Sequence, residues 1–534
     1  MVDTDDRAAL LRGLQRAQAY PHAVGPVQHL ETHISDVLLT GEYAYKLKKP
    51  LNLGFLDFST VELRRTCCEE ELRLNRRLAP ELYLAVVPIG GSLADPHVGA
   101  GAPIIDYAVQ MRQFDQAGML ERVAGRGELT AAIIDSIAEQ VAEFHSGLLP
   151  ASSASGYGTE AEIAGPALQN FDQLQPLVGS DAEREALAWL HEWTQQRHQA
   201  LASRFEARRQ AGFIRECHGD LHLGNITLVD GRVRIFDCIE FNPRLRWIDV
   251  MNEVAFLAMD LTQRGHPGLA YRFINRYLEH TGDYAGVDLL SYYMVYRALV
   301  RAKVAAMRAA QASASAEMRA RLQDKCRVHI ELARQLTAER RRVLLIMHGL
   351  SGSGKTVVSQ VVLETLGAIR IRSDVERKRL YGLAAGARSE SSLGEGIYAP
   401  SASQATYDRL SELAAAIVIA GYPVVVDAAF LKRGQRERFK SLAGTHNAGF
   451  AILDIQAAEA TLRRRIAKRI ESGADASEAN VTVLEQQLAD HEPLNVSERS
   501  AAHVFDTDQL SPAAVVHRLQ QIVPTIGGTA LISA

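Results

Sequence analysis

The sequence contains few cysteines, no long apolar run and no marked excess of either charge. Every apolar run stays short of the roughly 18 residues that a membrane-spanning helix needs, so we expect no membrane span. The N-terminus, MVDTDDRAALLRG, is acidic where a signal peptide is basic. The 5 cysteines form no Cys-x-x-Cys pair and no cluster with histidine, which fits a reducing compartment better than a disulfide framework or a zinc site. We therefore expect a cytoplasmic protein.

The overall composition is that of a folded chain with more than one domain. Apolar residues make up 47% of the 534 residues and charged residues 23%, which is too apolar for a disordered chain. A length of this order predicts two large domains or about three of ordinary size. The 59 basic and 63 acidic residues give a net charge of -4, so we do not expect a surface that binds polyanions over the whole protein.

One change in composition predicts a domain boundary. Residues 291–339 contain no glycine or proline and are rich in Ala, Leu and Arg, which predicts a helical hairpin broken near Ser313–Ser315. The next residues, RRVLLIMHGLSGSGKT, read as a buried strand that opens into a glycine-rich loop. We therefore place the boundary near Arg341, between a domain at 1–340 and a domain at 341–534.

The first domain divides again into two lobes. Residues 28–115 alternate short strand patterns around one helical stretch, Val61–Leu78, and predict a small mixed lobe. Residues 116–340 predict a larger helical lobe, in which 213–240 return to a strand–loop–strand pattern.

The strongest motif is GLSGSGKT, which follows the strand pattern Val343–Met347 and precedes a helical pattern. Glycines in such a loop let backbone N–H groups converge on phosphate oxygens, and the following helix adds a favourable dipole. Lys355 supplies a positive charge for the β- and γ-phosphates, and Thr356 supplies a hydroxyl for Mg²⁺. The predicted nucleotide-binding residues are Gly349, Ser351, Gly352, Ser353, Gly354, Lys355 and Thr356.

Later segments of this domain supply candidates for the chemistry. IRIRSDVERKRL is a strand pattern that ends near Arg372 and Asp374, VVVDAAFL ends near Asp427, and LRRRIAKR places Arg465 and Arg469 on one helix face. Asp374 could take a proton from an acceptor hydroxyl. Arg465 and Arg469 could neutralise the transferring phosphate if their helix forms a lid over the site, and we call them the lid arginines. Two alternatives stay open. Asp374 could merely cap the next helix, and the arginines could form a solvated basic face.

On these motifs residues 343–495 resemble the P-loop kinases of the polynucleotide kinase, gluconate kinase and zeta-toxin type, including the tail GADASEANVTVLEQQ. The resemblance implies that Asp374 is the catalytic base and that Asp427 is the Walker B-like acid, a metal ligand. It also implies that Arg372 and Arg377 lie where acceptor-binding residues lie.

A second motif lies in the first domain, where HGDLHLGN is followed by VRIFD. Asp220, Asn225 and Asp237 form a set of oxygen ligands that can deprotonate a hydroxyl and hold Mg²⁺. A plain strand–turn–strand hairpin with a polar tip is one alternative. A metal site on His218 and His222, at i,i+4 spacing, is another, but it would need a third ligand.

The second motif resembles the catalytic loop of the aminoglycoside phosphotransferase family of protein-kinase-like enzymes, and the likeness extends over about 28–305. It implies that Asp220 is the catalytic base, that Asn225 and Asp237 are metal ligands, and that Asp249 supports the loop. Within YAYKLKKP we expect Lys46 as the nucleotide-phosphate lysine, with Lys48 on the same strand face.

The pairing acid for Lys46 is Glu71, or Glu70, in CCEEELRLNRRLAP. Two features depart from the kinase pattern. The preceding hairpin has only Gly41 in place of Gly-x-Gly-x-x-Gly, and Cys-Ile follows Asp237 in place of Phe-Gly. The order of modules is similar to that of bacterial bifunctional aminoglycoside phosphotransferase/ATP-binding proteins.

The sequence thus predicts a multi-domain α/β and α+β protein, with an N-terminal bilobal protein-kinase-like fold and a C-terminal P-loop parallel α/β kinase fold. We expect an ATP-dependent phosphotransferase that uses ATP and Mg²⁺ in two modules. The alternatives are a single P-loop kinase regulated by a kinase-like ligand-binding domain, and an ATPase switch without a phosphorylated product. We expect a small-molecule or nucleotide acceptor; a nucleic-acid end stays open as an alternative, although the charge does not indicate one. The sequence identifies neither the acceptor nor the oligomeric state.

Overall fold

The computed structural model describes residues 4–52, 54, 56–99, 101–311, 315–389, 396–472 and 478–526. The chain divides into two compact units, which we call the N-terminal unit and the P-loop unit. The N-terminal unit comprises Met1–Ile133, Glu143–Asp260 and Tyr292–Ala333, and the P-loop unit comprises Ile134–Ala142, Leu261–Ser291 and Arg334–Ala534. No helix in the described ranges combines the length and the apolarity that crossing a bilayer requires. All five cysteines are free thiols.

The small lobe of the N-terminal unit is built on an antiparallel sheet of six strands in the order β1-β2-β3-β6-β4-β5. It confirms the predicted strand pattern around a single long helix. Its elements are α1 (Thr4–Leu14), β1 (Gln28–Glu31), β2 (Ser35–Leu39), β3 (Tyr43–Lys48), α2 (Val61–Asn75), β4 (Tyr83–Gly91), β5 (Pro96–Val98) and β6 (Ile104–Arg112).

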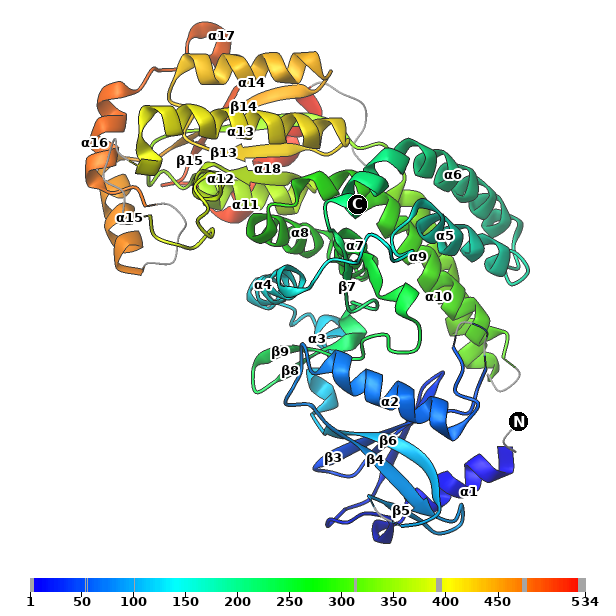
Figure 1. Cartoon of the computed structure of the whole chain (residues 1–534). Helices are drawn as coiled ribbons and strands as arrows, with labels where there is room; N and C mark the ends of the chain where they lie inside the picture. Colours follow the sequence, from blue (N-terminus) through cyan, green and yellow to red (C-terminus); the bar gives the residue numbers. More distant parts are fainter. Residues whose placement is uncertain are drawn as a thin grey trace. The chain divides into compact units, whose positions relative to one another are not determined.

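Alternation along β3 decides which side chains reach which face of this sheet. Tyr45 and Leu47 pack in the apolar cluster that also holds Leu10 and Leu14 of α1. The intervening residues, Lys46 and Lys48, therefore project towards the opposite face, which α2 covers (Figure 1). The lysines are thus brought to α2 by the period of the strand.

The rest of the N-terminal unit is mainly helical and carries two short antiparallel strand pairs, β7 with β10 and β8 with β9. The HGDLHLGN motif occupies the connection between β7 and β8. The elements of this part of the chain are α3 (Leu120–Gly125), α4 (Ala131–Gly147), α5 (Glu160–Leu174), α6 (Asp181–Gln210), β7 (Ile214–Glu216), β8 (Ile226–Val229), β9 (Arg232–Ile235), β10 (Trp247–Asp249), α7 (Val250–Gln263), α9 (Val287–Ala309) and α10 (Ala316–Leu336). Of these helices, residues 134–142 of α4, 261–263 of α7, 287–291 of α9 and 334–336 of α10 belong to the P-loop unit.

Helices α9 and α10 form the predicted helical pair ahead of the predicted boundary. The expected break at Ser313–Ser315 falls mostly on residues 312–314, which lie outside the described residues. Helix α8 (Pro267–Thr281), which lies between α7 and α9 in the chain, belongs to the P-loop unit.

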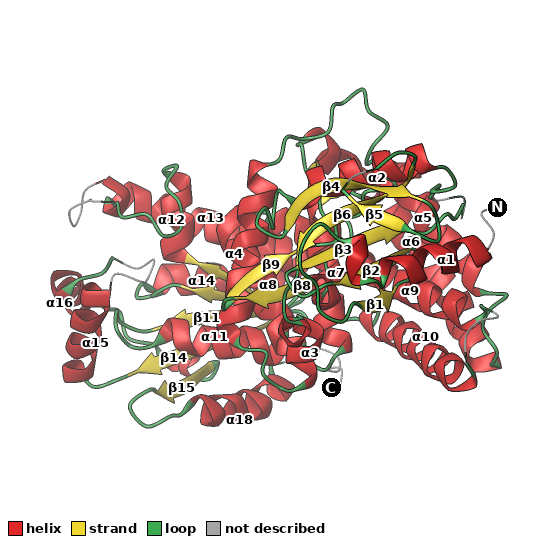
Figure 2. Ribbon diagram, turned by 90° about the horizontal axis from the view of Figure 1, so that it is seen from below, coloured by secondary structure: helices red, strands yellow, loops and turns green. Residues whose placement is uncertain are grey.

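The P-loop unit contains a parallel five-stranded sheet in the order β12-β13-β11-β14-β15, and Figure 2 shows β11, β14 and β15 side by side. This sheet confirms the predicted parallel α/β fold. Its elements are β11 (Val343–His348), α11 (Lys355–Leu366), β12 (Ile369–Arg372), α12 (Ser373–Leu380), α13 (Pro400–Ile419), β13 (Val424–Asp427), α14 (Arg433–Thr445), β14 (Gly449–Gln456), α15 (Glu459–Ser472), α16 (Val481–Asp490), α17 (Val496–Arg499), β15 (Ala502–Asp506) and α18 (Pro512–Ile522).

Because all five strands of this sheet run parallel, their carboxyl ends lie at one edge of the sheet. Residues of α11 and α18 share an apolar cluster with one face, and α13 and α14 pack against the other. The loop that leaves β11 begins at Gly349, which has a φ of +146° and lies so close to the carbonyl oxygen of Ile455 that a Cβ atom would collide with it. Gly354, with a φ of +94°, then turns the chain into α11.

Candidate functional site

The residues predicted around the glycine loop line one cleft in the P-loop unit. This cleft has a volume of about 690 Å³. It brings together segments that are more than a hundred residues apart in the chain. The predicted residues that line it are Ser351, Gly352, Gly354, Lys355, Thr356, Arg372, Asp374, Arg377, Asp427, Arg465 and Arg469. Gly349 and Ser353 instead line an adjoining cavity beside His348.

Lys355 is folded back on the glycine loop. Its Nζ donates to the carbonyl oxygens of Gly349, at 3.0 Å, and Leu350, at 2.8 Å. The N–H of Ser351 donates to Oε1 of Gln487 from α16, at 2.8 Å. Because this N–H belongs to the loop expected to hold phosphate, Gln487 is a polar neighbour of the phosphate position that the motif did not reveal.

The lid arginines are held in place by hydrogen bonds. Arg465 Nη1 donates to Thr507 Oγ1 at 2.8 Å and contacts the carbonyl oxygens of Gly352 and Ser353. Arg469 Nη2 donates to the carbonyl oxygen of Ala479. Both side chains line the cleft, so the alternative of a merely solvated basic face does not describe them.

Asp427 ends β13 at the floor of the same cleft, and its side chain is mostly buried. Oδ2 of Asp427 accepts a hydrogen bond from the hydroxyl of Ser359, at 3.0 Å. The hydroxyl of Thr356, one turn earlier on α11, lines the cleft as well. Hydroxyl and carboxylate oxygens are the donors that Mg²⁺ prefers, so this pair fits that ion.

Asp374 lies in the first turn of α12 and lines the cleft. The residue at the N-cap position is Arg372, and no side chain caps this helix end, so Asp374 is not the capping residue that the alternative required. Arg377, one turn further on, donates to Ile397 O at 3.1 Å and to Ser403 Oγ at 3.2 Å. The carboxylate of Asp374 and the guanidinium groups of Arg372 and Arg377 thus line the cleft together.

In the N-terminal unit the predicted catalytic loop is a compact hydrogen-bonded turn. The amide nitrogen of Asn225 donates to Asp220 Oδ2 at 2.9 Å and to the carbonyl oxygen of Asp220 at 3.0 Å. His218 Nε2 contacts Phe236 O at 2.8 Å, which ties this loop to the segment that carries Asp237.

Asp237 follows β9 with a φ of +64°, a left-handed backbone that a non-glycine residue rarely adopts. Strain of this kind persists only where surrounding contacts hold it. Here the N–H of Asp237 donates to Tyr83 Oη at 3.2 Å, and its carboxylate forms an ion pair with Lys46. The side chain is 42% exposed.

Lys46 also pairs with Glu71 of α2, with Nζ to Oε1 at 2.8 Å, which selects Glu71 over Glu70 as the pairing acid. Glu70 instead pairs with Arg73 and Arg246. Lys48 joins the same cluster, because it forms buried ion pairs with Glu71 and with Glu240.

Burial and neighbouring charges act on these groups in opposite directions. Burial by itself would raise the pKa of Glu71, but Lys46 and Lys48 lower it to about 2. For Asp220, burial again acts upward, yet the His222 ring and Arg301 hold the pKa of the carboxyl below its ordinary range. Both carboxyl groups are therefore charged at neutral pH.

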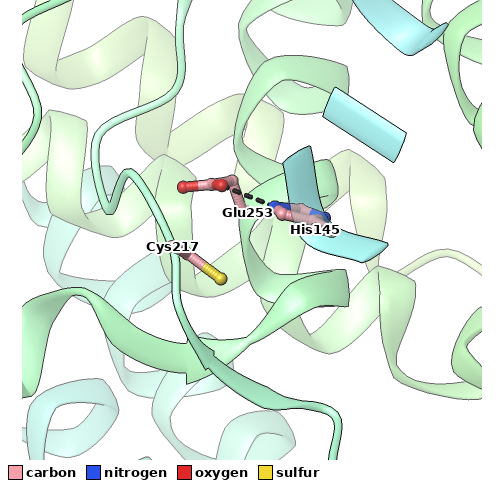
Figure 3. Close-up of side chains that lie close together, drawn as sticks. All are labelled: His145, Cys217 and Glu253. Carbon is pink, nitrogen blue, oxygen red and sulfur yellow. Dashed lines mark hydrogen bonds and ion pairs between the residues drawn. The ribbon is translucent and has the colours of Figure 1, made fainter. Parts of the chain in front are cut away.

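His145, Cys217 and Glu253 form the one group of three potential metal-ligating side chains found among the described residues (Figure 3). Glu253 already uses both oxygens: Oε1 accepts the N–H of Gly219 at 2.6 Å, and Oε2 bonds His145 Nε2 at 2.7 Å. Burial raises the pKa of the Cys217 thiol, which keeps it protonated. Glu253, which bonds His145, therefore holds Gly219 of the HGDLHLGN loop by hydrogen bonding.

The carboxylate that holds the catalytic loop was not apparent from the sequence. Asp249, to which the resemblance gives this role, forms a two-bond ion pair with Arg208. Glu253, one turn later on α7, contacts Gly219, and Asp260 accepts the N–H of Leu223 at 3.0 Å. The expected pair of His218 and His222 gains no third metal ligand in the described part of the chain.

Comparison with known proteins matches the two parts of the chain to two different family models. Residues 62–290 match the model of the phosphotransferase enzyme family, and residues 344–494 match the model of an AAA domain. The chain is thus an ATP-dependent phosphotransferase with an N-terminal protein-kinase-like fold and a C-terminal P-loop fold.

An uncharacterised protein of Mycobacterium tuberculosis is 30% identical over 464 residues, which cover 86% of this chain and 90% of the relative. The chain belongs to the same family as this protein. Two solved structures are similar at lower identity. A gluconokinase from Sinorhizobium meliloti is 21% identical, with 35% of this chain and 98% of that chain covered and a TM-score of 0.25. An amicoumacin kinase in complex with AMP-PNP is 13% identical, with 62% and 94% covered and a TM-score of 0.39.

The Glu71 cluster predicts a pH-dependent contribution to stability. Glu71 has an ordinary pKa of 4.5 and a pKa of about 2 in the folded chain, so its contribution is complete above pH 4.5 and is lost as pH falls towards 2. At pH 7 we expect Glu71→Gln to destabilise the N-terminal unit by roughly 3–5 kcal/mol, the usual cost of breaking a buried ion pair. The difference from the parent chain should shrink below pH 4.5.

Urea unfolding at several pH values, followed by tryptophan fluorescence, measures this difference. Glu70→Gln is the matched control, because Glu70 is the neighbouring residue on α2 and its side chain is more exposed than that of Glu71. A difference for Glu71→Gln that stays constant from pH 7 to pH 3 would contradict the assignment.

Proposed function

We propose that the chain carries two phosphotransfer sites, each of which uses Mg²⁺ and ATP to transfer the γ-phosphoryl group to a hydroxyl acceptor. The P-loop site comprises the cleft around Lys355, and the kinase-like site comprises Asp220, Asn225 and Asp237 with Lys46. The proposal rests above all on one observation: the residues predicted from separate motifs converge on a single cleft of about 690 Å³.

In the P-loop site the residues divide into a nucleotide side and an acceptor side. Lys355 and the loop N–H groups would bind the phosphates, and Arg465 would neutralise the charge that develops during transfer. Thr356 and Asp427 would hold Mg²⁺, which when bound screens the β- and γ-phosphate oxygens. Asp374 would accept the proton of the acceptor hydroxyl. Arg372 and Arg377, on its own side of the cleft, favour a small-molecule or nucleotide acceptor that carries negative charge.

In the kinase-like site the same tasks would fall to a different set of groups. Lys46, oriented by Glu71, would bind nucleotide phosphate. Asp237 and the amide oxygen of Asn225 fit Mg²⁺ as oxygen donors. Asp220, whose carboxylate is 35% exposed and held by Asn225, would orient and deprotonate the acceptor hydroxyl.

We propose domains at 1–340 and 341–534, with the small lobe at about 28–115 and the helical lobe at about 116–340. The compact P-loop unit also draws on 134–142 and 261–291. Experiments on the P-loop site are therefore designed for the full chain.

Lys355→Ala tests the P-loop site. The substitution removes the charge that faces the phosphates and no core packing, so the chain should stay folded and lose P-loop-dependent phosphoryl transfer by 10²-fold or more. A screen for transfer of labelled γ-phosphate to pools of small metabolites and nucleotides provides the measurement. Lys432→Ala is the control, because Lys432 lines the cleft but pairs with Glu492 near its rim. Wild-type transfer by Lys355→Ala would refute the site, and release of free phosphate without a labelled product would indicate an ATPase switch.

Asp374→Asn tests the proposed base. The amide cannot accept the proton, so transfer should fall by roughly 10²-fold or more while ATP affinity stays within twofold of the parent value. Asp490→Asn, on the exposed rim of the same cleft, should change neither quantity. An unchanged transfer rate together with a lower melting temperature would mean that Asp374 only stabilises the first turn of α12.

Asp237→Asn tests whether the kinase-like site binds metal and nucleotide. Asparagine tolerates the left-handed backbone at this position, whereas alanine would add strain. Mg²⁺ with ATP should stabilise the N-terminal unit of the parent, by about 2.7 kcal/mol at a hundredfold excess over Kd, and excess chelator should remove most of this gain. Asp237→Asn should lose the metal-dependent part, and Asp220→Asn should keep most of it.

Thermal unfolding of Lys355→Ala background variants isolates this effect from the P-loop site. Asp230→Asn, in the exposed turn of the β8–β9 hairpin, is the control. No stabilisation of the Lys355→Ala chain by any nucleotide at millimolar Mg²⁺ would leave the P-loop site as the only kinase site of the proposal.

A further inference from the structure

Helix α8 precedes the predicted domain boundary by about sixty residues, yet it packs within the P-loop unit. It lies beside α11, as Figure 1 shows, with Gly268 against the backbone of Glu364 and the Tyr271 ring against Gly367. The Tyr271 ring also joins the apolar cluster beneath the parallel sheet. Helix α8 is therefore part of the P-loop core.

Asn275 on α8 completes the outer edge of the sheet. Strand β12 is the outermost strand, so one side of its backbone has no neighbouring strand. Asn275 is buried, and its amide nitrogen donates to the carbonyl oxygen of Ala368 at 2.9 Å. Its amide oxygen accepts the N–H of Arg370 at 2.6 Å. One side chain thus makes the pair of hydrogen bonds that a further strand would make.

Glu279, one turn further along α8, binds the arginines that β12 carries. The residue is 1% exposed, and its Oε1 accepts Nε and Nη2 of Arg370 at 2.9 and 2.7 Å. Oε2 lies 3.9 Å from Nη1 of Arg372, one of the arginines on the acceptor side of the cleft. Burial raises the pKa of Glu279, but the two arginines outweigh it and hold the pKa below its ordinary range.

The hydroxyl of Ser359 lies between Arg370 and Asp427, the proposed metal ligand. Its Nη1 donates to Ser359 Oγ at 3.3 Å, and this hydroxyl donates to Asp427 Oδ2 at 3.0 Å. All three side chains are buried. Without Glu279, the buried guanidinium of Arg370 would carry a charge that no carboxylate of α8 balances. Asp427 is then a carboxylate within its reach, because the Ser359 hydroxyl contacts both groups.

We propose that Glu279 is a positioning residue of the P-loop site. It pairs with Arg370 from α8 and keeps this guanidinium from pairing with Asp427, so that the carboxylate oxygens of Asp427 stay available to Mg²⁺, while Arg372 is held at the acceptor side. This assignment rests on the proposed function of the P-loop cleft. On this proposal residues 261–291 contribute to a P-loop site whose other proposed residues all follow Arg341.

The test measures ATP affinity by calorimetry on the full chain, with excess Mg²⁺ and with excess EDTA. An Asp237→Asn background removes metal-dependent binding at the kinase-like site, and Lys355→Ala on that background defines the signal of the P-loop site. Glu279→Gln should reduce the gain in affinity that Mg²⁺ brings by about tenfold, the usual scale for a group that supports a metal ligand. Affinity in EDTA should stay within twofold of the parent value.

Glu364→Gln is the matched control. Glu364 pairs with Arg272 of α8 at 2.8 Å, so this variant loses the same charge at the same helix contact without touching the cleft arginines. It should leave both affinities unchanged. Hydrogen exchange of the β12 amides should match the parent in Glu279→Gln, because Asn275 still holds the strand edge; a merely structural loss would speed this exchange and weaken binding in EDTA as well.

The double variant Glu279→Gln with Arg370→Met separates the proposed route from any other. Removing the guanidinium together with its partner leaves no cation to pair with Asp427, so the effect of Mg²⁺ should return to within about threefold of the parent value. Loss of the Mg²⁺ effect without this rescue would overturn the proposal, as would an unchanged Mg²⁺ effect in Glu279→Gln. If Glu279→Gln does not fold, the double variant alone decides by the same criterion. If the parent shows no ATP binding that Lys355→Ala abolishes, the proposed P-loop function fails instead.

Discussion

In both candidate sites buried basic side chains lie close to a carboxylate of the site, and their charge must be balanced by other buried carboxylates. In the N-terminal unit, Lys46 contacts Asp237 directly, so its charge has to be shared with other partners. Glu71 takes part of it, and Lys48 and Glu240 extend the cluster on the α2 face of β3. Three carboxylates thus share two lysines, so the cluster keeps an excess of negative charge that can attract a further cation.

The P-loop unit meets the same constraint with different geometry. Asp427 does not contact a cation directly, because the Ser359 hydroxyl lies between it and Arg370. The charge of Arg370 is balanced by Glu279 from a helix outside the contiguous P-loop sequence. In both units, therefore, a buried carboxylate from another element, Glu71 or Glu279, balances the basic side chain that lies near the carboxylate of the site, Asp237 or Asp427.

Local periodicity and contiguous motifs predicted most of the fold, whereas contacts between distant segments escaped sequence reasoning. Alternation on β3 placed Lys46 and Lys48 on one face, and the GLSGSGKT loop lies between β11 and α11 as its spacing requires. The choice of Glu71 over Glu70 depended on the rotation of α2, which the sequence left open. Glu253 and Glu279 carried no signal, because a lone glutamate on an amphipathic helix is indistinguishable from a solvated one until the helix is packed.

One continuous stretch of chain contributes supporting residues to both sites. Helix α7 carries Glu253 and Asp260, which hold the catalytic loop of the N-terminal unit, and α8 follows directly with Asn275 and Glu279. A chain cut near Arg341 would leave β12 with an open edge and Arg370 with no carboxylate partner from α8. The domain that the sequence predicts, 341–534, therefore lacks the buried partners of its own β12. The compact P-loop unit has them, because it also includes residues 261–291.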